Sequence, residues 1–146
     1  MFESFDINAS GLTAQRYRLD VISENIANVD TTRTEDGTPY RRKSVIFAEK
    51  GSGHNFASAL EKAKGTYQGG GVKVVSTFED TTTDLKMVYD PAHPDADENG
   101  YVSYPNVDVV TEMTNLIDAT RAYEANATAF TASKNMAVKG LEMAQG

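Results

Sequence analysis

Cysteine is absent from this chain of 146 residues, which excludes a disulfide framework, a thiolate metal site and a cysteine nucleophile. A long hydrophobic run is also missing, because polar residues interrupt each apolar segment well before the ~18 residues that a membrane span requires. We therefore expect no membrane insertion. The chain begins with the acids Glu3 and Asp6 where a secretory signal peptide would have a basic start and an apolar stretch, so we expect no cleaved signal peptide.

An excess of positive charge is likewise absent. Asp and Glu number 21 against 14 Lys and Arg, and the formal net charge at pH 7 is -7. A protein that neutralises nucleic-acid phosphates normally carries a basic surface, so we expect no nucleic-acid partner. The densest basic cluster is Arg41–Lys43. Acidic residues flank it in the sequence (Glu35, Asp36 and Glu49), and we interpret it as a solvated surface.

Apolar side chains recur at helical spacing within residues 1–30, and this pattern predicts an N-terminal helix with one apolar face. The stripe consists of residues seven apart and their neighbours: Phe5, Leu12, Leu19, Ile22, Ile26 and Val29. Gly11 interrupts this helix at a cost of about 1 kcal/mol relative to Ala. It either ends a shorter helix or permits close approach of another backbone, and we favour close approach.

Residues 105–146 carry a second and longer stripe, which predicts a C-terminal helix. Its apolar members are Val109, Met113, Leu116, Tyr123, Phe130 and Leu141. Pro105 ends the preceding extended segment, and Asn106 or Asp108 is suited to cap the helix. At 1.5 Å per residue the helix would measure roughly 55 Å, more than the diameter of a small domain. Such a helix needs partners beyond its own core.

The middle of the chain, residues 31–104, is rich in Gly, Thr, Tyr and Val and predicts a small insert of β-hairpins. Short runs at 43–47, 72–76, 85–89 and 100–104 are typical of strands, and the spacing within Phe56–Ala63 suits one or two helical turns. The predicted fold class is therefore α+β. Long N- and C-terminal helices pack as a coiled-coil-like pair, and the β-rich insert lies between them in the sequence.

One segment, Asp95–Gly100, resembles the start of an EF-hand calcium loop. The bidentate Glu expected at position twelve of such a loop falls on Asn106, and the flanking segments are strand-like rather than helical. Asn99-Gly100 is also a strong turn signal, so we favour a structural turn over a calcium site. A metal-dependent enzyme that uses Asp95, Asp97 and Glu98 stays open as a minor alternative.

No other segment has the pattern of an active site or a cofactor site. His54 and His93 lie in polar surroundings without a second ligand at helical spacing, and we interpret both as surface residues. The Gly69–Gly71 run lacks the Lys-Ser/Thr ending of a phosphate-binding loop. We therefore expect no catalytic activity, no metal and no cofactor.

Four segments together resemble the terminal helices of flagellar rod and hook proteins. Ala9–Gln15 and Leu19–Asn28 are similar to the N-terminal helix of that family, and Pro105–Met113 and Arg121–Asn126 are similar to the C-terminal helix. These segments cover nearly half of the chain. Asp36–Arg42 is similar to the proximal rod members in particular, and the short insert also suits a rod subunit.

The resemblance implies a structural subunit of the proximal rod, which polymerises through its terminal helices into a tubular drive shaft across the periplasm. It implies that the partners are copies of the chain itself, other rod proteins and, during delivery, the flagellar type III export apparatus. The alternative is a free-standing helical hairpin with a β-rich recognition surface. The subunit interface expected from both stripes, with two asparagines added from the family pattern, comprises Phe5, Leu12, Leu19, Ile22, Asn25, Ile26, Asn28, Val29, Val109, Met113, Leu116, Tyr123, Phe130 and Leu141.

Overall fold

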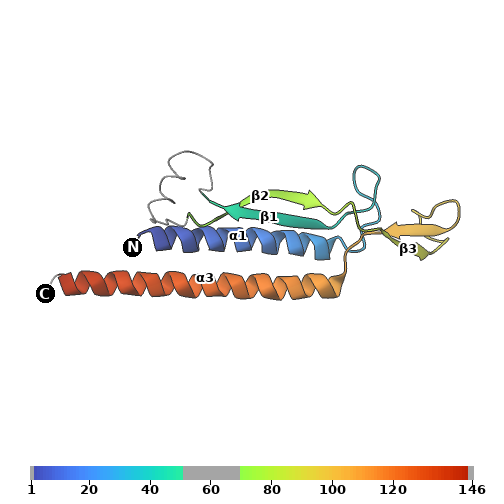
Figure 1. Cartoon of the computed structure of the whole chain (residues 1–146). Helices are drawn as coiled ribbons and strands as arrows, with labels where there is room; N and C mark the ends of the chain where they lie inside the picture. Colours follow the sequence, from blue (N-terminus) through green and yellow to red (C-terminus); the bar gives the residue numbers. More distant parts are fainter. Residues whose placement is uncertain (1, 51–69, 145–146) are drawn as a thin grey trace, which may run out of the picture. The chain divides into compact units, whose positions relative to one another are not determined.

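The computed structural model describes residues 2–50 and 70–144 of the chain. Two long helices, α1 (Phe2–Ala27) and α3 (Val109–Ala144), stand at the two ends of the sequence (Figure 1). Four strands lie between them in the sequence: β1 (Lys43–Glu49), β2 (Val72–Glu79), β3 (Lys86–Tyr89) and β4 (Tyr101–Tyr104). The α+β class with terminal helices and a small β-hairpin insert is confirmed. None of the helices in the described part is long and apolar enough to span a bilayer.

A polar side chain caps the start of α3 and another closes the end of α1. Asp108 is the N-cap of α3, because its carboxylate accepts a hydrogen bond from the backbone N–H of Thr111 at 3.1 Å. The hydrogen bond from the Thr111 hydroxyl, together with that backbone bond, lowers the pKa of the Asp108 carboxyl below its usual range. At the other helix, the Asn28 side chain donates to the carbonyl of Glu24 at 2.9 Å and closes the last turn of α1.

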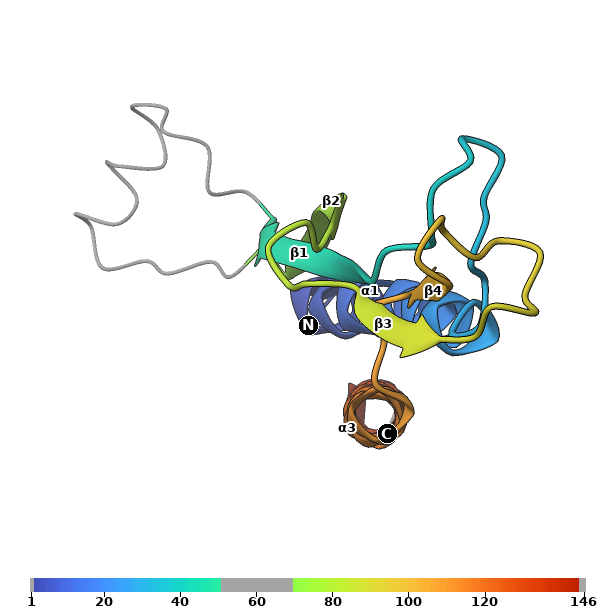
Figure 2. The same ribbon diagram turned by 90° about the vertical axis from the view of Figure 1, so that its right-hand side faces the viewer.

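The strands form two separate two-stranded sheets. β1 pairs with β2, and β3 pairs with β4 in an antiparallel register that sets Lys86 opposite Tyr104 and Tyr89 opposite Tyr101 (Figure 2). The four predicted strands are thus confirmed, although β2 continues three residues beyond its predicted end. The turn predicted at Asn99-Gly100 is present, with the Gly100 N–H donating to the carbonyl of Asp97 at 3.0 Å. It belongs to a longer connection, residues 90–100, rather than to a two-residue hairpin loop.

Part of the predicted insert is outside the described residues. The helical turns expected within Phe56–Ala63 and the position of His54 fall in residues 51–69.

The described residues belong to two compact units. Unit 1 comprises Met1–Tyr17, Ile46–Ser76 and Ala119–Gly146, and unit 2 comprises Arg18–Val45 and Thr77–Asp118. The interior of unit 2 includes the apolar residues Val21, Ile22, Val102 and Val107, but its fully buried side chains also include Asn25 and Glu112. Because buried polar groups need hydrogen-bond partners, these two residues indicate a hydrogen-bond network inside unit 2.

Candidate functional site

A cluster of polar side chains lies buried in unit 2, and we call it the buried polar cluster: Asn25, Tyr40, Arg42 and Glu112. Glu112 has no exposed surface, and its carboxylate accepts hydrogen bonds from Arg42 Nε at 2.7 Å and from Asn25 Nδ2 at 3.0 Å. The cluster connects the C-terminal part of α1, the approach to β1 and the first turns of α3. Charge-assisted hydrogen bonds of this kind are stronger than neutral ones, and here they satisfy a buried carboxylate.

Asn25 uses its whole amide inside the chain. Nδ2 donates to Glu112 and to the carbonyl of Lys43 at 2.8 Å, and Oδ1 accepts from the Lys43 N–H at 2.8 Å and from the Tyr40 hydroxyl at 2.9 Å. Burial, followed by the negative charge of Glu24, raises the pKa of Tyr40 well above its usual value. The Tyr40 hydroxyl therefore stays protonated and acts as a hydrogen-bond donor throughout the physiological pH range.

A second asparagine extends this network toward the β-insert. Asn106 Oδ1 accepts from the Arg42 N–H at 2.8 Å, and Nδ2 donates to the carbonyl of Asp80 at 2.9 Å. The Asp80 carboxylate in turn accepts bonds from the hydroxyls and N–H groups of Thr82 and Thr83, with Thr83 contributing most to a lowered Asp80 pKa. Each of these groups has a partner, so the arrangement is suited to hold three segments together rather than to bind a reactant.

The structure corrects two interpretations from the sequence. Asn25 was expected in the subunit interface, but its amide is buried and occupied within the chain, and a helical pattern alone does not reveal partners from distant segments. The basic cluster Arg41–Lys43 was interpreted as a solvated surface balanced by its sequence neighbours. Instead Arg42 pairs with Glu112, and Lys43 pairs with Glu24 at 2.6 Å.

Unit 1 shows how its helical segments approach each other. A Cβ added to Gly11 would lie 2.7 Å from Asn126 Oδ1, which is too short for an ordinary contact. Gly11 therefore leaves room for a neighbouring group, but that group is the Asn126 side chain and not the backbone that the sequence analysis favoured. Nearby, the rings of Phe5 and Phe130 meet edge to face with centroids 5.1 Å apart.

The most buried positions of α3 are not those of its apolar stripe, which the sequence analysis assigned to the subunit interface. The most buried residues within the described helix are Glu112, Ala119 and Ser133, whose separations of seven and fourteen residues keep them in one heptad register. Small and polar side chains thus occupy these buried positions. Among the predicted interface residues, Ile22 is buried and the others below stay exposed: Val109 (38 %), Met113 (54 %), Tyr123 (37 %) and Leu141 (64 %).

The remaining predicted interface residues lie at positions of partial exposure. On α1 these are Phe5, Leu12, Leu19 and Ile26, followed by Asn28 and Val29 beyond its end, and on α3 they are Leu116 and Phe130. Asn28 uses its side chain locally, since Oδ1 also accepts from the Thr31 hydroxyl at 3.1 Å.

The first turns of α3 carry an outward apolar face, which we call the outer stripe: Val110, Met113 and Ile117. Their exposed fractions are 72 %, 54 % and 52 %. The three residues follow the i, i+3, i+7 spacing that places side chains on one face of a helix. Isolated exposed apolar residues are normal, but an aligned set on a helix indicates a contact surface.

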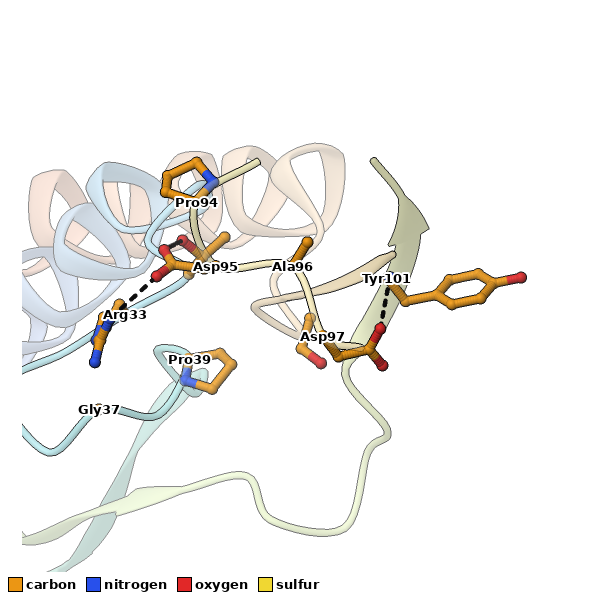
Figure 3. Close-up of a pocket in the computed structure, with 10 residues that line it drawn as sticks. Arg33, Gly37, Pro39, Pro94, Asp95, Ala96, Asp97 and Tyr101 are labelled. Atoms are coloured by element: carbon orange, nitrogen blue, oxygen red, sulfur yellow. Dashed lines mark hydrogen bonds and ion pairs between the residues drawn. The ribbon is translucent and has the colours of Figure 1, made fainter. Parts of the chain in front are cut away.

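A pocket of about 370 Å³ lies on unit 2 between two loops (Figure 3). The Asp95 carboxylate at its edge accepts from the Thr32 hydroxyl at 2.8 Å and pairs with Arg33 at 3.4 Å. The Asp97 carboxylate accepts from the backbone N–H of Tyr101 at 2.8 Å. The acids of the calcium alternative thus hold loops and a turn, and the described residues contain no group of three or more potential metal ligands of the His, Cys, Asp and Glu types.

Comparison with known proteins gives the family. Residues 5–33 match the family described as flagella basal body rod protein, and residues 98–143 match the C-terminal family of the flagellar basal body rod FlgEFG proteins. Over 97 % of both chains, the sequence is 46 % identical to the flagellar basal-body rod protein FlgC of Bacillus subtilis. This chain belongs to the FlgC family.

Other members of the FlgC family are similar over the same extent. The flagellar basal-body rod protein FlgC of Borreliella burgdorferi is 46 % identical over 100 % of this chain and 99 % of its own. That of Salmonella typhimurium is 43 % identical over 97 % and 96 %. The two matched segments contain Asn25 and Glu112, respectively, whereas Tyr40 and Arg42 of the buried polar cluster lie outside both.

Proposed function

We propose that this chain is a structural subunit of the flagellar basal-body rod and that it polymerises through its terminal helices. Membership of the FlgC family supports the first part. The observation that carries the second is the outer stripe, since α3 turns a buried glutamate inward and leaves aligned apolar side chains outward. Covering that stripe with a neighbouring subunit would remove apolar surface from water, which favours association.

The proposed interface follows from exposure together with position on the helices. It retains Val109, Met113, Tyr123 and Leu141, which are exposed in the single chain, and the partly exposed members of the predicted set. Val110 and Ile117 are added to it. Asn25 is withdrawn, because a side chain that is fully buried with its amide bonded within the chain offers nothing to a neighbour.

The proposal assigns the subunit to the proximal rod, in a tube that crosses the periplasm and transmits torque. Its partners are further copies of the chain and other rod proteins, and the flagellar type III export apparatus delivers it. No catalytic step is part of this function. The free-standing binding module is not favoured, because the three relatives described above, with nearly full-length similarity, are rod proteins.

The test places charges on the outer stripe of the chain in the bacterium that encodes it. Met113→Asp with Ile117→Asp adds two charges to the proposed contact, and we expect loss of motility and of assembled rods, because burying an unpaired carboxylate is unfavourable. The matched control, Ala125→Asp with Ala129→Asp, adds the same charges at exposed positions of α3 outside the stripe and should leave motility intact.

Soft-agar swimming and electron microscopy of isolated basal bodies are the readouts. Immunoblots of exported protein separate a failure of delivery from a failure of assembly. Normal rods in the Met113→Asp/Ile117→Asp strain would rule out the outer stripe as an assembly surface.

A further inference from the structure

The inward face of α3 in unit 2 is the opposite of what hydrophobicity alone would select. A helix places successive residues about 100° apart around its axis, so the outer stripe lies about 100° to 160° from Glu112. If the outer stripe were turned inward, the helix would bury a valine, a methionine and an isoleucine. Instead the helix buries the carboxylate of Glu112, whose side chain is 1 % exposed.

The hydrogen-bond partners of Glu112 account for this orientation. Arg42 Nε and Asn25 Nδ2 both aim at its carboxylate, at 2.7 Å and 3.0 Å, and Asn115 Nδ2 lies 3.4 Å from the oxygen that Arg42 binds. A rotation of α3 that brought the outer stripe inward would remove this carboxylate from both donors. It would leave one N–H of the fully buried Asn25 amide without an acceptor and the partly covered Arg42 without its carboxylate.

We propose that the buried polar cluster determines which face of α3 turns inward in unit 2. It thereby keeps the outer stripe outward, available for contacts between subunits. This second statement rests on the proposed function, whereas the first concerns the single chain. Buried ion pairs often add little stability compared with apolar side chains of similar volume, and a role in selecting one arrangement over another is their better-attested use.

The absence of natural cysteine allows the orientation of α3 to be measured by thiol reactivity. Single cysteines are introduced on the outer stripe, by Met113→Cys or Ile117→Cys, and on the inward face of unit 2, by Leu116→Cys, one turn from Glu112 and partly covered. In the otherwise unaltered chain, iodoacetamide should modify the outer cysteines at least about tenfold faster, because a covered thiol reacts only when the structure opens locally. Similar rates at all three positions would overturn the proposal.

The same cysteines are then placed in a chain in which Arg42→Met and Glu112→Ala remove the ion pair without adding a large apolar side chain to the inward face. We expect the reactivity difference to disappear or to invert, since burial of the outer stripe is no longer opposed. The matched control, Arg33→Met with Asp95→Ala, removes an exposed ion pair of the same unit and should preserve the order.

Two outcomes with the Arg42→Met/Glu112→Ala variant would contradict the proposal. One is the unaltered order of reactivity. The other is loss of helical circular dichroism, which would mean that the cluster supplies stability rather than the choice of face.

Rod formation separates this inference from the proposed function. The expected change in reactivity combined with normal rods would leave the choice of face intact and refute the use of the outer stripe in assembly. Unchanged reactivity in the cluster variant, combined with failed assembly of the Met113→Asp/Ile117→Asp variant, would refute the choice of face and leave the outer stripe intact as an assembly surface.

Discussion

Removal of Arg42 is the sharpest test of the buried polar cluster. Arg42→Met keeps a long apolar side chain but deletes the donor that lies 2.7 Å from Glu112. The Glu112 side chain is 1 % exposed and that of Arg42 is 29 % exposed, so the variant leaves a nearly fully buried carboxylate without its cation. Breaking a buried pair from one side costs about 3 to 5 kcal/mol, and the partial exposure of Arg42 favours the lower figure, about 3 kcal/mol.

Urea denaturation followed by circular dichroism measures this loss. With a slope of about 2 kcal/mol/M, the midpoint should fall by about 1.5 M. The matched control is Arg33→Met, which removes an exposed pair with a separation of 3.4 Å and a 68 % exposed arginine. A pair of that kind contributes less than about 1 kcal/mol, so its midpoint should shift by less than about 0.5 M.

A second variant distinguishes an uncompensated charge from lost packing. Arg42→Met combined with Glu112→Leu should regain most of the stability, because no charge is then left buried. Equal destabilisation by Arg42→Met and Arg33→Met would refute the argument, since it would mean that Glu112 does not depend on Arg42 in solution.

Two further predictions concern the helices. Gly11→Ala should not stabilise the chain despite an intrinsic gain of about 1 kcal/mol, because Asn126 must move, whereas in an Asn126→Ala background it should stabilise by about that amount in urea titrations. Hydrogen bonds from Thr111 lower the pKa of Asp108, so its contribution to stability is complete above the unfolded-state pKa of about 4 and is lost as the pH falls through the lower native value. Asp108→Asn should flatten the acid side of the stability profile measured by circular dichroism, and an unchanged profile would contradict the capping role.

Much of the fold follows from local patterns in the sequence. The seven-residue spacing of apolar side chains and the cap at Asp108 predict α3 almost to the residue, because both act within one or two turns. The alternation of Val72, Lys73 and Val74 likewise predicts β2. These elements depend on residues that are close together in the sequence, so a short stretch of sequence is enough to predict them.

The buried polar cluster could not be predicted in the same way. Arg42 and Glu112 are 70 residues apart, and nothing near either residue indicates the other. Asn25 and Glu112 are polar, so a rule that places apolar residues inside assigns both to the surface and turns Met113 inward. The structure reverses that assignment because tertiary hydrogen bonds, not hydropathy, select the inward face of α3.

The central claim is that the chain assembles into the rod through helix faces that stay apolar and exposed in the single subunit. The most direct measurement is an electron cryomicroscopy structure of the basal body from the bacterium that encodes this chain. We expect neighbouring subunits to cover Val110, Met113 and Ile117, while Asn25 and Glu112 keep their contacts within one chain. An assembled rod in which these three side chains face water would contradict the account.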